Sequence, residues 1–175
     1  MTANVSIGDS KNNPIMVDEG TMHAAYTASF LSYQALKGQE AYNKPCNNIR
    51  FWFNQVGTRF NLAVRADSKI RNMTDLKDKH ICLGMKGGDA AYLGLAFLEF
   101  HGLTPEKVKS SGGQLSYMPL GEAANMLQDG KIDAMFCMVA PYHILKSVDA
   151  TFGVRLIPMS KESIQYVIKR YPGGE

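Results

Sequence analysis

The chain has 175 residues, 45% of them hydrophobic and 10% aromatic, so it is long and apolar enough to bury a core and is expected to be ordered. Nineteen basic and sixteen acidic residues give a net charge of +3, and no basic stripe points to nucleic acid as a partner. No apolar run approaches the roughly 20 residues that span a bilayer, so direct membrane insertion is not expected. The first residues lack the charged and apolar regions of a secretory signal.

The first third of the chain predicts short strands and helices in alternation, with glycines that end helices at positions 20 and 38. The expected strands are residues 5–7, 23–27 and 49–53, and the expected helices are residues 13–19 and 29–36. The polar segment 38–48 is predicted to be a mobile surface loop in which Cys46 is exposed.

The most informative stretch lies within residues 67–103, where a short buried strand at 81–84 is followed by glycines and a helix at 90–100. Such a turn leaves backbone N–H groups at the carboxyl edge of a sheet, where they can hold a polar or anionic ligand. The remaining expected strands are residues 60–65, 114–118, 131–139 and 154–158, and the remaining helices are residues 122–130, a helix opened by Pro141, and 161–170.

Strands that alternate with helices predict an α/β fold with mostly parallel sheets flanked by helices. We expect a partial first lobe at residues 1–65 that ends in a crossover strand, and a second α/β lobe at 66–160. Residues 161–175 are expected to form a closing helix that returns toward the first lobe. Two lobes joined by a strand suggest a hinge and a cleft.

Side chains that could do chemistry are scattered, so no catalytic residue, metal site or cofactor is predicted. Cys82 and Cys137 lie in apolar runs, where a thiol usually behaves as a small buried hydrophobe, and no Cys or His spacing suggests zinc. The four histidines have no carboxylate or serine at a spacing typical of a triad. A paired-carboxylate site would arise only if the fold brought together Asp75, Asp78 and Asp133.

Four aromatic residues are expected mainly in the core, namely Phe51, Trp52, Phe53 and Phe60. Trp52 alternates with its neighbours and is a candidate for facing the cleft.

Three motifs follow one another between residues 75 and 134: DLKDK at 75–79, LEFHGL at 98–103 and DGKIDA at 129–134. Their joint order resembles the TAXI family, the solute-binding receptors of TRAP transporters, within the type 2 periplasmic binding protein fold. The resemblance runs from about residue 5 to residue 172. It implies a two-lobed binding protein, not an enzyme, that closes on a small organic acid or amino acid and hands it to the TRAP transporter membrane subunits.

The same resemblance implies a periplasmic or otherwise extracytoplasmic location. It also implies that the chain is truncated at both ends, because such receptors usually have a signal peptide and a further strand–helix unit before residue 5 and a C-terminal portion after residue 172.

The resemblance places ligand contacts in both lobes. In the first lobe they are Ser10, Asn13 and, more weakly, Ser29; in the second lobe they are Gly87, Gly88, Asp89, Ala90, Pro141 and Tyr142. Lys86 is added as a candidate because of its positive charge. From the residues alone, Gly87 and Gly88 could serve only the turn, and Ser10 and Asn13 could cap the helix that follows.

Asp89 stands where the family tends to have hydroxyl groups, and it is a natural N-cap that would occupy the positive end of its helix. Either Asp89 turns away and Lys86 supplies positive charge to an anion, or Asp89 faces the cleft and holds an ammonium group. Two other classes stay open: a transferase-like enzyme on the same scaffold, and a truncated relative that binds nothing.

Overall fold

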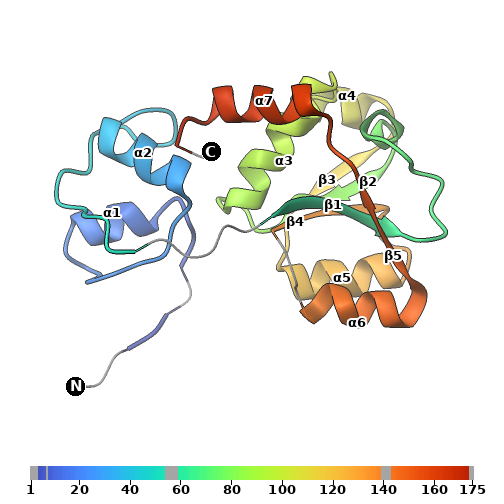
Figure 1. Ribbon diagram of the computed structural model, residues 1–175, viewed down its shortest axis with the longest axis horizontal. Coiled ribbons are helices and arrows are strands. Elements are labelled where there is room, and N and C mark those ends of the chain that lie inside the picture. Colours follow the sequence, from blue (N-terminus) through green and yellow to red (C-terminus); the bar gives the residue numbers. More distant parts are fainter. Residues whose placement is uncertain (1–3, 7, 54–58, 139–142, 174–175) are drawn as a thin grey trace. The chain divides into compact units, whose positions relative to one another are not determined.

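The computed structural model describes residues 4–6, 8–53, 59–138 and 143–173, and the chain divides into two compact units (Figure 1). Unit 1 comprises Met1–Asn54, Gly87–Asp89 and Tyr171–Glu175. Unit 2 comprises Gln55–Lys86 and Ala90–Arg170.

Unit 2 is built on one five-stranded sheet with the order β3-β2-β4-β1-β5. β2 pairs in parallel with both β3 and β4, whereas β1 is antiparallel to its neighbours β4 and β5. The α/β fold predicted from the sequence is therefore confirmed. The strands are β1 (Phe60–Arg65), β2 (His80–Cys82), β3 (Gln114–Ser116), β4 (Ala134–Met138) and β5 (Val154–Ile157).

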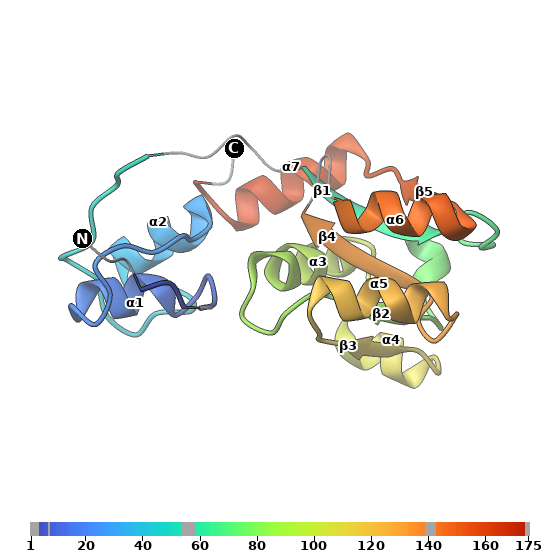
Figure 2. The ribbon, with the colours of Figure 1, turned by 90° about the horizontal axis from the view of Figure 1, so that it is seen from below.

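Helices cover both faces of this sheet (Figures 1 and 2). On one face lie α3 (Asp89–Phe100) and α7 (Lys161–Arg170), and on the other lie α5 (Leu120–Gln128) and α6 (His143–Phe152). On the α3 face, the Phe60 ring stacks on the rings of Phe97 and Phe136, with centroids 5.4 and 5.3 Å away. On the α5 face, a buried cluster includes Ala63, Cys82, Ala123, Leu127, Met135, Cys137 and Val148.

Two short elements of unit 2 were not predicted. The helix α4 (Pro105–Ser110) begins at Thr104, whose side chain accepts a hydrogen bond from the Lys107 N–H, and Pro105 opens its first turn. The 3₁₀ helix η1 (Met73–Leu76) begins at Asn72 and has a capping box closed by Asp75. Both carry ordinary N-terminal signals.

Unit 1 contains α1 (Asn13–Asp18) and α2 (Ser29–Lys37), and no strand among its described residues. The predicted strands at 23–27 and 49–53 are wrong: neither segment forms a strand or a helix. Residues 5–6 are likewise not in a strand, and residue 7 lies outside the described residues. The predicted end of α2 is confirmed, since Gly38 adopts a left-handed conformation with φ 63°.

The surface of unit 1 also differs from expectation. Cys46 was predicted to be exposed, but it is buried, with 2% of its surface exposed. Its segment folds back on α2, where the Cys46 N–H donates to the Ala35 carbonyl at 2.8 Å. Phe51, Trp52 and Phe53 are 69–82% exposed, so three of the four aromatic residues expected in the core lie on the surface.

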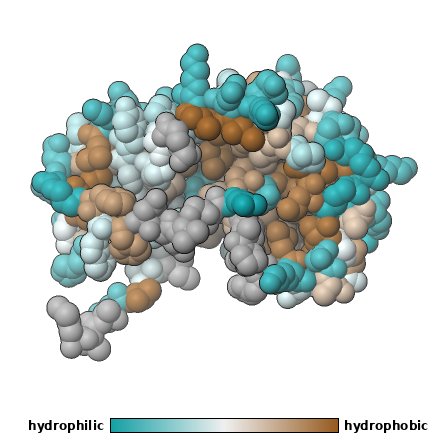
Figure 3. Space-filling model, in the orientation of Figure 1, coloured by the Kyte–Doolittle hydropathy of each residue, from teal (hydrophilic) through white to brown (hydrophobic). Residues whose placement is uncertain are grey.

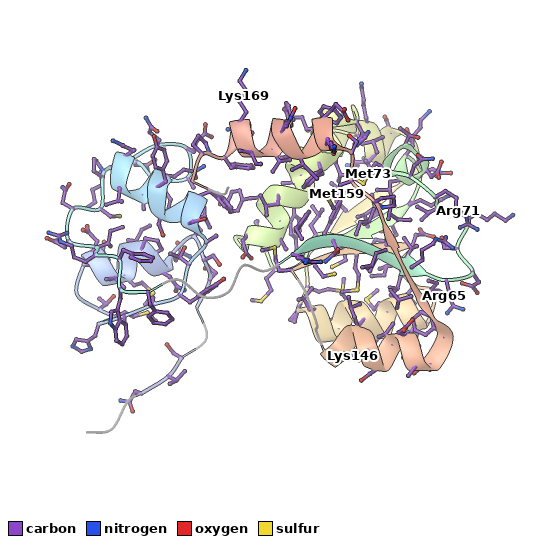
Figure 4. The ribbon with its side chains drawn as sticks, in the orientation of Figure 1. Arg65, Arg71, Met73, Lys146, Met159 and Lys169 are labelled. Carbon is purple, nitrogen blue, oxygen red and sulfur yellow. The ribbon has the colours of Figure 1, made fainter. Side chains whose placement is uncertain are left out.

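Both units show hydrophobic areas among hydrophilic ones on the face seen in Figure 3. The basic side chains labelled in Figure 4 come from different elements of unit 2: Arg65 from β1, Lys146 from α6, Lys169 from α7, and Arg71 from the loop after β1. Among the described residues, no helix is both long and apolar enough to cross a membrane.

Candidate functional site

The segment of residues 8–13 in unit 1 carries two of the predicted ligand contacts, and Asp9 fixes its turn. The Asp9 carboxylate accepts hydrogen bonds from the Asn12 N–H at 2.8 Å and from Asn12 Nδ2 at 2.7 Å. The Asp9 carbonyl accepts from the Asn13 N–H at 3.0 Å. Asn12, the N-cap of α1, makes no side-chain cap bond, so neither Ser10 nor Asn13 serves as the cap that the sequence left open.

Asn13 is the first residue of α1 and connects two segments of unit 1. Its Nδ2 donates to the Tyr26 carbonyl at 2.6 Å. Its Oδ1 is buried and accepts no hydrogen bond from the described residues. A Cβ at position 8 would lie 2.3 Å from this oxygen, which explains the glycine at that position. In this arrangement the Asn13 side chain faces protein.

Ser10 presents a hydroxyl group that makes no hydrogen bond with the described residues, although the residue is half-buried. Its backbone is held in place instead. The Ser10 carbonyl accepts from Thr27 Oγ1 at 2.6 Å, and the neighbouring Lys11 carbonyl accepts from the Tyr42 hydroxyl at 2.9 Å. A hydroxyl on a fixed backbone can both donate to and accept from a bound solute.

Ser29 is exposed and is the first residue of α2. The N-cap before it is Ala28, which has no side-chain oxygen and makes no cap bond. Gly173 lies against this end of the helix, since a Cβ added to it would come within 3.5 Å of the Ser29 carbonyl oxygen.

Gly87–Asp89 belongs to unit 1 together with Ser10 and Asn13. Gly87 has φ 79°, and a Cβ there would lie 3.4 Å from Asp9 Oδ1. Asp89 is the first residue of α3, and Gly88 is half-buried beside it. Burial raises the pKa of the Tyr26 hydroxyl, and the negative charge of Asp89 raises it further. This part of unit 1 thus holds the carboxylates of Asp9 and Asp89, with Lys11 as the basic residue of segment 8–13.

The remaining predicted contacts are in unit 2 or are not described. Lys86 is exposed and takes part in none of the ion pairs found among the described residues. Ala90 is 7% exposed and lies against Gly84, whose added Cβ would come within 3.2 Å of the Ala90 Cβ. Gly84 has φ 82° and is a turn glycine that the sequence reasoning did not single out. Pro141 and Tyr142 lie outside the described residues.

The three aspartates considered for a carboxylate pair each have their own partner. Asp75 Oδ2 accepts from the N–H groups of Arg71 and Asn72, and Asp133 Oδ2 accepts from the His80 N–H at 2.8 Å. Asp78 forms an ion pair with Lys79 at 2.8 Å. The hydrogen bond from Lys79 to Asp78 raises the pKa of Lys79 most, and the charges of the other two aspartates add to it.

A surface pocket of about 290 Å³ lies in unit 2 and contains none of the predicted contacts. Its lining comes from α5 and α6: Gly121, Ala124, Asn125, Gln128, Ser147, Val148 and Thr151. Within the described ranges, no group of three or more His, Cys, Asp or Glu side chains could hold a metal ion.

A comparison with curated proteins finds no match. Among solved structures, the chain is similar to the periplasmic aliphatic sulphonate binding protein SsuA from Escherichia coli, at 23% identity and a TM-score of 0.47, over 56% of this chain and 29% of that one. The alkanesulfonate-binding protein SsuA from Xanthomonas axonopodis pv. citri, bound to MOPS, matches at 24% identity and a TM-score of 0.46, over 57% and 31% of the two chains.

An ancestral arginine-binding protein bound to arginine matches at 14% identity and a TM-score of 0.42, over 67% of this chain and 61% of that one. This chain spans less than a third of the length of the two sulfonate-binding proteins, at 29% and 31%.

The match to a protein-family model extends much further along the chain. The model of the NMT1-like family matches residues 1–174, a range that includes both units. The chain therefore belongs to the NMT1-like family.

Proposed function

We propose that the chain is a solute-binding protein, not an enzyme, that captures a small organic acid or amino acid outside the cytoplasm and delivers it to the subunits of a membrane transporter. The resemblance of its motif series to the TAXI family supports a TRAP-type transporter as the partner. The solute contacts are residues that this resemblance assigns, led by Ser10 and Gly87–Asp89, while Asn13 helps to hold the turn that carries Ser10.

One observation carries this proposal: Ser10, Asn13, Gly87 and Asp89 belong to one compact unit although they come from two distant segments of the chain. Gly87 lies beside the Asp9 carboxylate, at the base of the turn that carries Ser10. A few polar groups that converge from different segments are what a small-molecule site requires.

The charges of unit 1 favour an amino acid over a simple organic anion. The hydroxyl groups of Ser10 and Ser29 can donate hydrogen bonds to a carboxylate. The carboxylates of Asp9 and Asp89 repel a second negative charge and suit a protonated amine. A zwitterion offers both groups.

The test is a thermal-unfolding screen of the wild-type chain with L-alanine, L-glutamate, L-arginine, succinate and 2-oxoglutarate. A solute present at 100 times its dissociation constant stabilises the folded state by about 2.7 kcal/mol, which raises the melting temperature by several degrees. We expect at least one amino acid to do so. Ser10→Ala is expected to reduce the shift, and Ser110→Ala on the exposed surface of α4 is the matched control. The absence of a shift with all five compounds would contradict the proposal.

A further inference from the structure

The turn that carries Ser10 is held by side chains rather than by a sheet. Among the described residues of unit 1 there is no strand, so no backbone ladder fixes residues 8–13. Three hydrogen bonds between side chain and backbone connect this segment to the rest of the unit. They join Thr27 Oγ1 to the Ser10 carbonyl at 2.6 Å, the Tyr42 hydroxyl to the Lys11 carbonyl at 2.9 Å, and Asn13 Nδ2 to the Tyr26 carbonyl at 2.6 Å.

Thr27 is also close in sequence to the start of α2. Two residues after Thr27 the chain reaches Ser29, the first residue of α2. Thr27 therefore joins the backbone of Ser10 to the start of α2 by one hydrogen bond and two peptide units. This hydrogen bond thus connects the backbone of Ser10 to the segment that leads into α2.

Tyr42 supports the same turn from another direction. It is 4% exposed, so its ring is fixed by packing, and its hydroxyl group reaches the carbonyl of the residue directly after Ser10. A buried aromatic ring has few accessible rotamers, and its hydroxyl group therefore holds the backbone at a defined place.

We infer that Thr27 and Tyr42 are positioning residues, which hold the Ser10 hydroxyl where a bound solute can reach both it and Ser29. This inference rests on the proposed receptor function. They act through the backbone of Ser10 and Lys11 and do not contact the solute. Without them the turn samples other conformations, and each binding event has to order it again, which weakens affinity.

The experiment measures solute affinity by isothermal titration calorimetry, using whichever of L-alanine, L-glutamate, L-arginine, succinate and 2-oxoglutarate the wild type binds. Thr27→Val keeps the shape but removes the hydroxyl group, and Tyr42→Phe removes only the hydroxyl group. Each is expected to weaken binding about five- to tenfold, the effect of one lost hydrogen bond. Thr27→Ser keeps the hydroxyl group and is expected to restore wild-type affinity. Tyr33→Phe, an exposed tyrosine of α2, is the matched control.

A double-mutant cycle separates positioning from general stabilisation. In a Ser10→Ala background, Thr27→Val is expected to cost less than about twofold in affinity, because the hydroxyl group that Thr27 positions is already gone. A merely structural role would make the two effects multiply, and that result would overturn the inference. Wild-type affinity in both Thr27→Val and Tyr42→Phe would overturn it as well. If Thr27→Val does not fold, Tyr42→Phe in the same cycle distinguishes the two roles.

The failure of the proposed function has a different signature. In that case the wild type binds none of the five compounds, and both the proposed function and the positioning role are rejected. A wild type that binds, combined with variants that bind equally well, removes the positioning role alone.

Discussion

The two units of this chain maintain their structure by different means. In unit 2, backbone hydrogen bonds join five strands, and both faces of the sheet are covered by buried apolar side chains. In unit 1, the two short helices α1 and α2 are connected by segments without strands, and individual side chains of Asn13, Thr27 and Tyr42 hold those segments together. Most of the predicted solute contacts lie in unit 1.

This difference indicates where the molecule is sensitive. Unit 2 depends on apolar burial, so large-to-small changes in its core should cost most. Unit 1 buries fewer apolar side chains, such as Leu31 and Ala35 of α2, and its segments are joined by single polar contacts worth about 1 kcal/mol each, so the loss of one hydroxyl group should loosen it locally without unfolding the whole chain.

The largest effect is expected for Phe136→Ala in β4. Phe136 is fully buried and its ring stacks on Phe60 at 5.3 Å, so its removal should lower the free energy of unfolding by about 3–5 kcal/mol. Urea denaturation followed by circular dichroism measures this change. Leu156→Ala in β5, where the side chain is 48% exposed, is the control and should change stability far less. A loss for Phe136→Ala as small as that of the control would contradict the comparison.

Cysteine modification tests whether unit 1 opens more easily than unit 2. Cys46 in unit 1 and Cys137 in unit 2 are both buried, and burial raises the pKa of both thiols, that of Cys137 to about 12. Because thiolate is the reactive form, both should react slowly at pH 8. Cys46 should nevertheless be alkylated by iodoacetamide at least about tenfold faster, since its unit opens at a lower free energy. Mass spectrometry of the labelled peptides gives the two rates, and equal rates would refute the difference.

Tyr42→Phe should produce a smaller and local change. Loss of the hydrogen bond to the Lys11 carbonyl is expected to destabilise unit 1 by about 1 kcal/mol, which corresponds to a roughly fivefold faster modification of Cys46. The rate at Cys137 should not change. Tyr33→Phe provides the control, and an equal acceleration at both cysteines would mean that the two units open together.

The smallest effect concerns Asp75 in unit 2. Hydrogen bonds from the N–H groups of Arg71 and Asn72 lower the pKa of Asp75 below its ordinary value. Since the folded pKa is the lower one, the carboxylate stabilises the fold above the unfolded pKa of about 3.9, and this contribution is lost as the pH falls through the folded pKa. The difference in melting temperature between wild type and Asp75→Ala should thus be constant at neutral pH and shrink below about pH 4. A difference that did not vary with pH would contradict this cause.

Local signals predicted the helices well. The end of α2 at Lys37 follows from Gly38, and the C-terminal helix α7 was predicted with the bounds that the structure shows. The helix α4 could also have been found, because Thr104 and Pro105 are a typical helix start.

Strands were predictable only where partners existed. The apolar pattern of residues 60–65 predicted β1 correctly, since β4 and β5 pair with it. The similar patterns at 23–27 and 49–53 led to wrong predictions, because a strand needs a neighbouring strand that local sequence does not reveal.

The residues of the candidate site were also predicted only in part. Ser10, Asn13 and the Gly87–Asp89 turn were assigned from a resemblance that depends on motif order, and they remain predictions as solute contacts. The residues that hold the Ser10 turn were missed, because Thr27 and Tyr42 are 17 and 31 positions away from the carbonyls that they contact. Cys46 was wrongly predicted to be exposed, because the residues around it in the loop are polar.

The place of β1 in the sheet has a consequence for the order of folding. β1 lies between β4 and β5, so both of its partners are made much later on the ribosome than β1 itself. During synthesis, the apolar residues Leu62 and Val64 cannot be buried in the sheet until strands roughly 70 residues or more downstream have been made, and such non-local pairing is slow. The nascent chain therefore exposes an unpaired apolar strand until β4 and β5 have emerged, and this is the interval in which aggregation or chaperone binding competes with folding.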